Sequence, residues 1–261
     1  MRTKKMKPIW RVGIVCLLIT SLFLSCTAKQ NVEERKDVAE ASKTLGEAYL
    51  REGNFRAALK ELKKAEPTLP DDYYLQNDLG LCYLYLGQPD LAIDHFKKAL
   101  AMKENYAPAR NNLGNAYAQK KDWDKAIKQY KIVISDLLYA TPEYPLSNLG
   151  KIYYQKKEYG LSEKYYLQAL KVKGDFFYAL DGLAKTYMAT GKLSEAITYF
   201  EKAVQVAPES AQVHFDLAKA YLLKGDFRKA YAAYVRVVQL DPDGPLADQA
   251  VREAERIKHL F

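Results

Sequence analysis

The sequence predicts an all-α solenoid, in which six helix–turn–helix repeats stack in a row and a C-terminal helix caps the stack. A leucine followed by glycine or alanine recurs at spacings of 34, 34, 36, 34 and 34 residues, and a tyrosine stands three residues after the small residue in all six copies. The 261 residues include only 13 glycines and 10 prolines, too few for an all-β chain with many turns. Since one helix pair cannot bury its own apolar face, stacking is expected to form the core.

Residues 1–25 are predicted to be a signal peptide and not part of the fold. They carry five Lys or Arg and no acid, and residues 12–24 form a 13-residue apolar run. As a helix this run would reach about 20 Å, which is short of the roughly 30 Å hydrocarbon core of a bilayer. A basic start followed by a short apolar run is typical of a cleaved signal peptide.

The signal ends in the run Leu-Phe-Leu-Ser, directly before Cys26. Apolar residues and then a small residue before cysteine resemble the bacterial lipobox. This resemblance implies that the peptide is cut before Cys26 and that this cysteine is acylated on its thiol and on its new amino group. Several acyl chains make release from a membrane negligible, because each buried CH₂ adds about 0.8 kcal/mol. An ordinary signal peptide followed by a chance cysteine is the alternative.

Residues 26–38 are polar and are predicted to be a lipidated tether. Thr27 takes the place of the aspartate that usually retains Gram-negative lipoproteins in the inner membrane, so we expect the outer membrane, with the repeats facing the periplasm. Without residues 1–25, 35 basic residues face 32 acidic ones, a net charge of +3 with the two signs interleaved. No nucleic-acid partner is expected, because nucleic-acid-binding faces cluster Lys and Arg.

The repeats are expected to follow one another without linkers. Their predicted boundaries are 39–72, 73–106, 107–142, 143–176, 177–210 and 211–244. The small residue at position 8 of each repeat lets the two helices approach closely, and the bulky residue at position 24 is expected to pack onto the next repeat. Residues 245–261 hold apolar side chains at steps of four, four, three and four from Leu246 to Phe261, which predicts an amphipathic capping helix.

Repeat three is two residues longer than the others. The extra residues enter within residues 135–142, and Pro142 and Pro145 flank the start of the next helix, as suits a boundary. Two interpretations stay open at this point. The insertion is either a tolerated lengthening of a loop, or a local bend or partner contact.

The length, residue types and register of the repeats resemble the tetratricopeptide repeat (TPR) over residues 39–244. The resemblance implies a right-handed superhelix whose concave face is lined by positions 2, 5, 9, 12 and 13 of each first helix. The residues that we expect to bind a partner there are Tyr74, Asn77, Leu81, Leu84, Tyr85, Asn111, Asn115, Gln119, Tyr144, Lys151 and Tyr154. The same positions in repeats four to six also hold Gln155, Tyr178, Asp181, Lys185, Met188, Phe215, Lys219, Leu222 and Leu223. Tyrosines and leucines mixed with amides suit an extended or helical peptide, and the alternative is that some of them only pack against the second helices.

The lipobox, the six repeats and the Thr-Pro insertion ahead of repeat four together resemble the type IV pilus biogenesis and stability lipoproteins, the PilF/PilW pilotin group. Members of that group help the secretin, the outer-membrane ring through which the pilus passes, to reach the membrane and multimerise. The resemblance implies a protein partner, the pilus secretin, and membrane attachment through the N-terminal lipid. A general periplasmic envelope scaffold that binds peptidoglycan enzymes or outer-membrane assembly factors is the alternative.

Catalysis is not expected from this sequence. His95, His214 and His259 occupy unrelated positions, and no carboxylate pair, phosphate-binding glycine loop or Ser/His/Asp set occurs. We therefore expect no enzyme activity, no metal, no cofactor and no small-molecule substrate. Cys82 would be the only thiol left after processing, so it cannot form an internal disulfide and is interpreted as a small buried residue.

Overall fold

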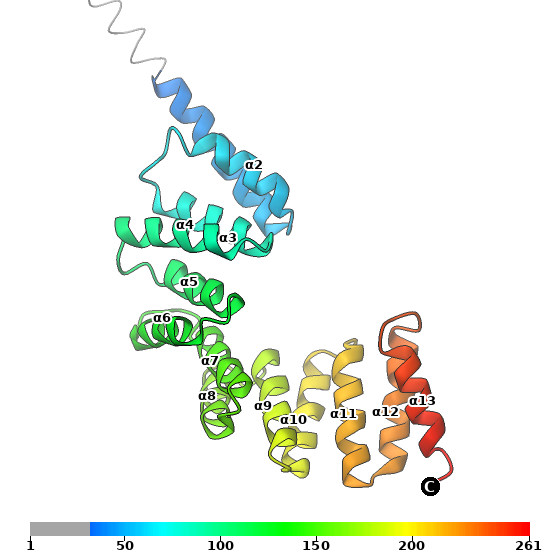
Figure 1. The fold of residues 1–261 in the computed structure, drawn as a ribbon. Helices are drawn as coiled ribbons and strands as arrows, with labels where there is room; N and C mark the ends of the chain where they lie inside the picture. Colours follow the sequence, from blue (N-terminus) through cyan, green and yellow to red (C-terminus); the bar gives the residue numbers. More distant parts are fainter. Residues whose placement is uncertain (1–31) are drawn as a thin grey trace, which may run out of the picture. The chain divides into compact units, whose positions relative to one another are not determined.

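A computed structural model describes residues 32–261, and the predicted signal peptide and Cys26 lie outside this range. The described residues form helices and turns, with no β-strand among them (Figure 1), which confirms the all-α prediction. None of the helices within this part of the chain is long and apolar enough to cross a bilayer. The chain divides into two compact units, one ending at Ala109 and one beginning at Arg110, and each is described by itself.

Unit 1 contains the first two helix pairs. A helix over residues 32–51 packs against α2 (Phe55–Ala65), and α3 (Tyr73–Tyr85) packs against α4 (Pro89–Met102). The turns inside the pairs contain Gly53 and Gly87, whose φ angles of +74° and +75° favour glycine. One buried apolar cluster of unit 1 consists of Ala39, Ala58, Leu62, Ala65, Leu75, Leu79 and Cys82, and α4 adds the buried residues Ala92, Ile93, Phe96 and Ala99.

The first helix begins earlier than the sequence predicts. The tether is expected to reach residue 38, but residues 32–38 are helical and exposed. The first buried residue is Ala39, which is 3% exposed, so packing begins at the predicted start of repeat one. The helix extends beyond the packed part because residues of high helix propensity, such as Glu34 and Arg35, add backbone hydrogen bonds without needing a core.

Unit 2 contains the remaining helix pairs and the cap. Its helices are α5 (Ala107–Gln119), whose first turn precedes the boundary, α6 (Trp123–Ser135), α7 (Glu143–Gln155), α8 (Tyr159–Val172), α9 (Phe177–Ala189), α10 (Leu193–Val206), α11 (Ala211–Lys224), α12 (Phe227–Leu240) and α13 (Ala247–Ile257). From α6 onward each helix packs on the next, and α7 also packs on α9, so the first helices of repeats four and five are neighbours. One continuous buried core connects α7 to α13.

Small residues let the two helices of a repeat touch, as predicted. A Cβ on Gly114 would lie 2.6 Å from Cε1 of Tyr130, and a Cβ on Gly150 would lie 2.8 Å from Cδ1 of Tyr166. Both tyrosines stand at position 24 and fill the space that the glycine of their own repeat leaves. Tyr166 also lies against Gly182 of repeat five, so the predicted contact with the next repeat is present there in addition to a contact inside the repeat.

The turn glycine is absent from repeats three and four. Lys121 and Lys157 occupy the equivalent positions with φ angles of +60° and +61°, while Gly191 and Gly225 keep glycine in repeats five and six. An L-residue in this left-handed region costs roughly 1–2 kcal/mol because Cβ approaches the following carbonyl oxygen. Both turns are therefore locally strained in a way that the glycine turns are not.

The connection between α6 and α7 contains the insertion of repeat three. Pro142 is the N-cap residue of α7 and Pro145 lies in its first turn, as the sequence predicts. The cap helix α13 buries Ala247, Ala250, Ala254 and Ile257. Phe261, predicted on the same apolar face, lies beyond the end of α13 and is 51% exposed.

Candidate functional site

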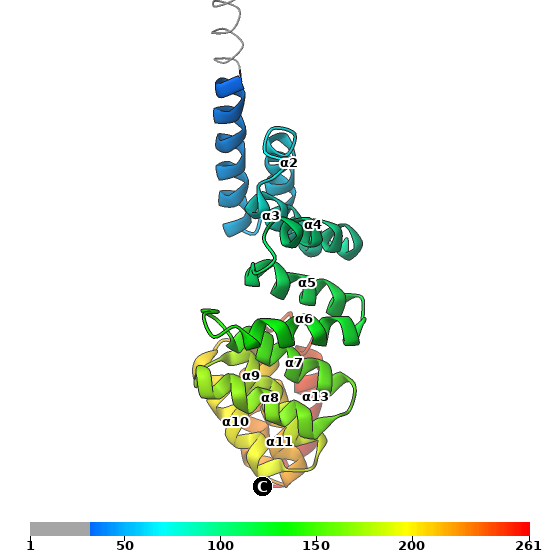
Figure 2. The ribbon, with the colours of Figure 1, turned by 90° about the vertical axis from the view of Figure 1, so that its left-hand side faces the viewer.

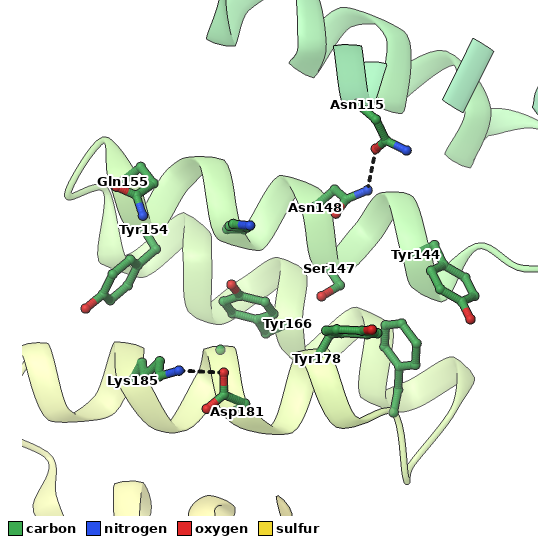
Figure 3. Close-up of a pocket in the computed structure, with 13 residues that line it drawn as sticks. Asn115, Tyr144, Ser147, Asn148, Tyr154, Gln155, Tyr166, Tyr178, Asp181 and Lys185 are labelled. Atoms are coloured by element: carbon green, nitrogen blue, oxygen red, sulfur yellow. Dashed lines mark hydrogen bonds and ion pairs between the residues drawn. The ribbon is translucent and has the colours of Figure 1, made fainter. Parts of the chain in front are cut away.

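The first helices of repeats four and five form an open groove in unit 2, with a cavity of about 570 Å³. Residues three or four apart lie on the same face of a helix, so each helix presents one row of side chains to the groove. From α7 these are Tyr144, Ser147, Asn148, Lys151, Tyr154 and Gln155, and from α9 they are Tyr178, Asp181, Gly182 and Lys185. Asn115 of α5, Tyr166 of α8 and Phe176 at the start of α9 complete the lining (Figure 3).

One end of the groove is aromatic. Phe176 is buried and packs edge-on against Tyr144, with ring centroids 4.9 Å apart, and against Tyr178, with centroids 5.5 Å apart. Tyr144 and Tyr178 themselves are 44% and 63% exposed. The buried phenylalanine thus packs against two tyrosine rings that both remain substantially exposed to solvent. Rigid amphipathic rings of this kind are suited to anchoring a partner side chain, because little conformational freedom is lost on binding.

Amide groups line the α5 side of the groove. The side-chain oxygen of Asn115 accepts a hydrogen bond from the Tyr130 hydroxyl at 2.7 Å and another from the Asn148 amide nitrogen at 3.0 Å (Figure 3). These two bonds fix the orientation of the Asn115 side chain. Its amide nitrogen therefore points away from Tyr130 and Asn148 and can donate a hydrogen bond to a ligand. An extended peptide offers backbone carbonyls at regular spacing, which such donors can bind.

The α9 side of the groove carries a charged group. Lys185 Nζ lies 2.7 Å from Asp181 Oδ2 and 3.3 Å from Asp216 Oδ2. Burial disfavours the charged form of Lys185, but its bonds to the two carboxylates outweigh this effect and raise its pKa. Burial also raises the pKa of Asp181 against the opposing effect of Lys185. Asp181 Oδ1 is buried without a hydrogen-bond partner among residues 32–261, so the groove contains an acceptor that a ligand N–H can satisfy.

Four of the predicted binding residues come together in this groove, namely Asn115, Tyr144, Lys151 and Tyr154. Gln155, Tyr178, Asp181 and Lys185, which occupy the same repeat positions, line it as well. Asn111 and Gln119 lie on α5 outside the lining. Prediction from repeat positions did not include Ser147, Asn148, Tyr166, Phe176 and Gly182. Ser147 stands at position 5 of repeat four, which is itself a lining position, and Asn148 and Gly182 stand at position 6 of their repeats, next to it. These positions are the signal that could have found the three residues.

The predicted residues of unit 1 lie on α3. Tyr74 and Tyr85 are 47% and 62% exposed, Leu81 and Leu84 are half-buried, and Asn77 is only 5% exposed. Tyr85 stacks on Phe55 at a centroid distance of 4.3 Å, as a residue that packs on a neighbouring helix would do. Asn77 therefore has little surface to offer a partner, and the two tyrosines remain the accessible candidates in this unit.

Asp78 is a partly buried carboxyl group next to these residues. Burial raises its pKa to about 6, although the hydrogen bond from Asn77 Nδ2 to Asp78 Oδ1, 3.1 Å long, opposes the shift. Burial and the nearby Asp78 charge also raise the pKa of Cys82 to about 12. Since the thiolate is the reactive form, Cys82 is an inert buried residue at neutral pH, as its sequence context predicts.

Metal-binding side chains do not cluster in the described part of the chain. Within residues 32–261, no group of three His, Cys, Asp or Glu residues is arranged to hold a metal ion. The three histidines are far apart in the sequence, and His95 is buried with Nδ1 2.7 Å from Gln76 Oε1. The groove of unit 2 thus presents aromatic, amide and charged side chains as its chemistry.

Stacked helix pairs, close contacts at small residues and a groove lined by first helices define an α-solenoid of the protein-binding kind. Tetratricopeptide-repeat family models match residues 43–107, 77–145, 146–176 and 187–254, which together are more than half of the chain. The chain belongs to the tetratricopeptide-repeat family. Proteins of this family are typically non-catalytic scaffolds that bind protein partners.

Proteins similar in sequence include a pilus assembly protein and a member of a eukaryotic complex. The type IV pilus assembly protein PilF of Pseudomonas aeruginosa is 27% identical over 138 residues, which cover 53% of this chain and 55% of PilF. The BBSome complex member BBS4 of Bos taurus is 30% identical over 115 residues, which cover 44% of this chain and 22% of BBS4. The chain thus spans about half of PilF and about a fifth of BBS4.

Solved structures of type IV pilus proteins are among those that share the fold over most of the chain. The crystal structure of PilW, described as a widely conserved type IV pilus biogenesis factor, matches with a TM-score of 0.75 at 23% identity and covers 82% of this chain and 98% of PilW. The structure of Pseudomonas aeruginosa PilF matches with a TM-score of 0.71 at 21% identity and covers 87% of this chain and 100% of that chain. The predicted resemblance to the PilF/PilW group is confirmed.

Proposed function

We propose that this protein is a type IV pilus biogenesis factor that binds a segment of the pilus secretin and promotes its membrane localisation and multimerisation. The observation that carries the proposal is similarity to one group of proteins in both sequence and fold. PilF is similar along the sequence, and PilW and PilF share the fold over nearly their whole length. BBS4, by contrast, is matched over only 22% of its length, as expected where the generic repeat pattern is shared.

The groove of unit 2 supports a peptide ligand. At one end it offers the rings of Tyr144 and Tyr178, which pack on Phe176. On the α5 side it offers the hydrogen-bonded amides of Asn115 and Asn148, and on α9 it offers Oδ1 of Asp181, which has no hydrogen-bond partner within residues 32–261. An extended peptide can place an apolar or aromatic side chain between Tyr144 and Tyr178 and donate a backbone or side-chain N–H to Asp181. The secretin segment that binds is therefore expected to combine an apolar anchor with a hydrogen-bond donor a few residues away.

Attachment to the outer membrane through lipidated Cys26 is part of the proposal. Its support is the sequence alone: a basic start, a 13-residue apolar run and a small residue directly before Cys26. Thr27 favours the outer over the inner membrane. A lipid-anchored adaptor that faces the periplasm is in a position to meet secretin subunits before they enter the outer membrane.

The proposal is tested in a strain that lacks the gene and is complemented with groove variants. Tyr144→Ala with Tyr178→Ala removes both aromatic anchors, and we expect the secretin to remain monomeric on a gel and surface pili to be lost. The matched control is Leu167→Ala with Val172→Ala, which truncates two similarly exposed side chains of α8, 40% and 52% exposed, outside the groove. This control is expected to restore multimers.

The outcomes separate the proposal from its alternative. Normal secretin multimers in the uncomplemented deletion strain would contradict a role in secretin assembly. They would favour a general periplasmic scaffold for peptidoglycan enzymes or outer-membrane assembly factors. Lost multimers in the deletion strain together with normal multimers in the groove variant would keep the pilus role and move the binding site away from unit 2's groove. The exposed Tyr74 and Tyr85 of unit 1 would then be the next residues to replace.

A further inference from the structure

The connection between α6 and α7 presents two adjacent leucines to solvent. Leu137 is 96% exposed and Leu138 is 93% exposed, whereas Val32, the next most exposed large apolar residue among residues 32–261, is 67% exposed. Figure 2 shows this loop standing out from the end of α6. Neither leucine contributes to the buried core of unit 2, so intramolecular packing does not explain why these positions are apolar.

The loop that carries the leucines is held by defined hydrogen bonds. Asp136 Oδ1 accepts the Leu138 N–H at 3.0 Å, and the Asp136 carbonyl accepts the Tyr139 N–H at 3.2 Å. The Thr141 carbonyl accepts the Tyr144 N–H at 3.3 Å at the start of α7. The Asp136 carboxylate, the acid nearest to the leucines in the sequence, is thus used to stabilise the turn. The turn keeps both leucines at a convex tip.

The size and shape of this tip favour a lipid surface over a folded protein as its partner. Two leucine side chains offer on the order of 200 Å² of apolar surface. A stable protein–protein interface buries about 800 Å² on each partner. A small protruding tip falls well short of that, but it matches the way in which short apolar segments enter the boundary between headgroups and acyl chains, where no complementary protein surface is needed.

Side chains of α6, which leads into the loop, and of the loop itself have the chemistry of a membrane interface. Lys128 and Lys131 lie one turn apart on α6, both exposed, and neither forms an ion pair within the described part of the chain. Tyr139 follows the leucines directly and is half-buried. Lysines bind anionic headgroups at about 1 kcal/mol each, and tyrosine is enriched at the level of the headgroups.

We propose that this loop dips into the interface of an anionic phospholipid bilayer. Leu137 and Leu138 enter among the upper acyl chains, Tyr139 lies at the headgroups, and Lys128 and Lys131 contact lipid phosphates. The contact is separate from the predicted lipid on Cys26 and does not depend on the pilus role. It would orient unit 2 relative to a membrane surface.

Photo-crosslinking of the full chain tests this contact directly. The full-length protein is reconstituted into vesicles of phosphatidylethanolamine and phosphatidylglycerol at a ratio of 3:1, with benzoylphenylalanine in place of Leu138 in one variant and of Leu223 in another. Leu223 is the matched control, since it is also exposed (62%) and lies in unit 2 away from the loop. After flotation and irradiation, we expect a phospholipid adduct from position 138 and none from position 223.

Two further substitutions, each made in the variant with the probe at position 138, test whether the contact needs the apolar side chain and the lysines. Leu137→Asp is expected to lower the adduct yield at least about tenfold, because the neighbouring apolar side chain is lost. Lys128→Glu with Lys131→Glu is expected to lower the adduct yield at least about fivefold. The control Lys171→Glu with Lys202→Glu changes the net charge by the same amount and is expected to leave the yield unchanged. Vesicles of phosphatidylcholine, which carry no net negative charge, are expected to lower the adduct yield as much as the two lysine substitutions do, even when both lysines are present.

Other results overturn the proposal. Crosslinked dimers in place of lipid adducts would show that the tip is an interface between copies of this chain. Equal lipid adducts from positions 138 and 223 would show that proximity to the vesicle, and not the loop, decides the yield. A chain that fails to float with the vesicles would count against both the loop contact and the N-terminal anchor, while flotation without any adduct would overturn the loop contact alone.

Discussion

The close contact inside repeat three can be tested by replacing Gly114 with leucine. Even a Cβ at this position would lie 2.6 Å from Tyr130 Cε1, a separation that real structures do not tolerate. Tyr130 cannot move away freely, because its ring is 1% exposed and its hydroxyl donates to Asn115 Oδ1 at 2.7 Å. Overpacking costs about 1–3 kcal/mol, and loss of the Tyr130 hydrogen bond adds about 0.5–1.5 kcal/mol. Gly114→Leu should therefore destabilise unit 2 by about 2–4 kcal/mol.

The measurement is thermal unfolding followed by circular dichroism, with Gly160→Leu as the control. Gly160 is also a helical glycine, but a Cβ there meets nothing within 4 Å, so its substitution should change stability little. For Gly114→Leu we expect the melting temperature to fall by roughly 4–16 °C. Because Asn115 also binds Asn148 of α7, the groove should lose ligand affinity as well. Equal melting curves for the two variants would refute the reasoning that the small residue is needed for helix contact.

Three other predictions follow from single residues. Cys26→Ala should leave the precursor unlipidated and uncleaved by the lipoprotein signal peptidase, and labelled palmitate retained by the mutant would contradict the lipobox. Lys121→Gly should stabilise the chain by about 0.5–1 kcal/mol in urea unfolding because it relieves a φ of +60°, whereas Gly191→Lys should destabilise it by a similar amount; the reverse order would disprove the strain. Asp78 binds its proton more tightly in the folded chain, with a pKa of about 6 against 3.8, so stability should fall as pH rises from about 4 to about 6 and then stay constant. Asp78→Asn should abolish this decline and add roughly 1–3 kcal/mol at pH 7, and an unchanged pH profile would show that Asp78 is not responsible.

The positions of the helices could be predicted because the repeat pattern is a local requirement repeated six times. A small residue must face a large one wherever two helices cross closely, as Gly114 faces Tyr130. The start of the first helix could not be predicted in the same way. Residues 32–38 make no buried contact, so no apolar pattern marks them, and only helix propensity extends the helix.

The groove was predicted in part, and the missing residues have physical reasons. Repeat positions 2, 9 and 12 identified Tyr144, Lys151 and Tyr154, which line the groove together with the residues at positions 2 and 9 of repeat five, Tyr178 and Lys185. Tyr166 was missed because position 24 is a core position, and Phe176 was missed because it lies outside the first-helix positions; both are buried residues that also line the groove. The exposure of Leu137 and Leu138 likewise depends on the hydrogen bonds of one turn, which spacing alone does not reveal.

The central claim is that unit 2's groove binds a secretin segment, and a direct binding measurement tests it best. Fluorescence anisotropy of the purified full chain with labelled peptides that together span the secretin should identify one segment that binds. Tyr144→Ala with Tyr178→Ala should weaken that binding at least about tenfold, since truncation of an anchoring aromatic residue commonly costs 1–3 kcal/mol or more. Leu167→Ala with Val172→Ala should leave it unchanged. If no secretin peptide binds, or if the tyrosine variant binds as tightly as the parent, the claim is contradicted.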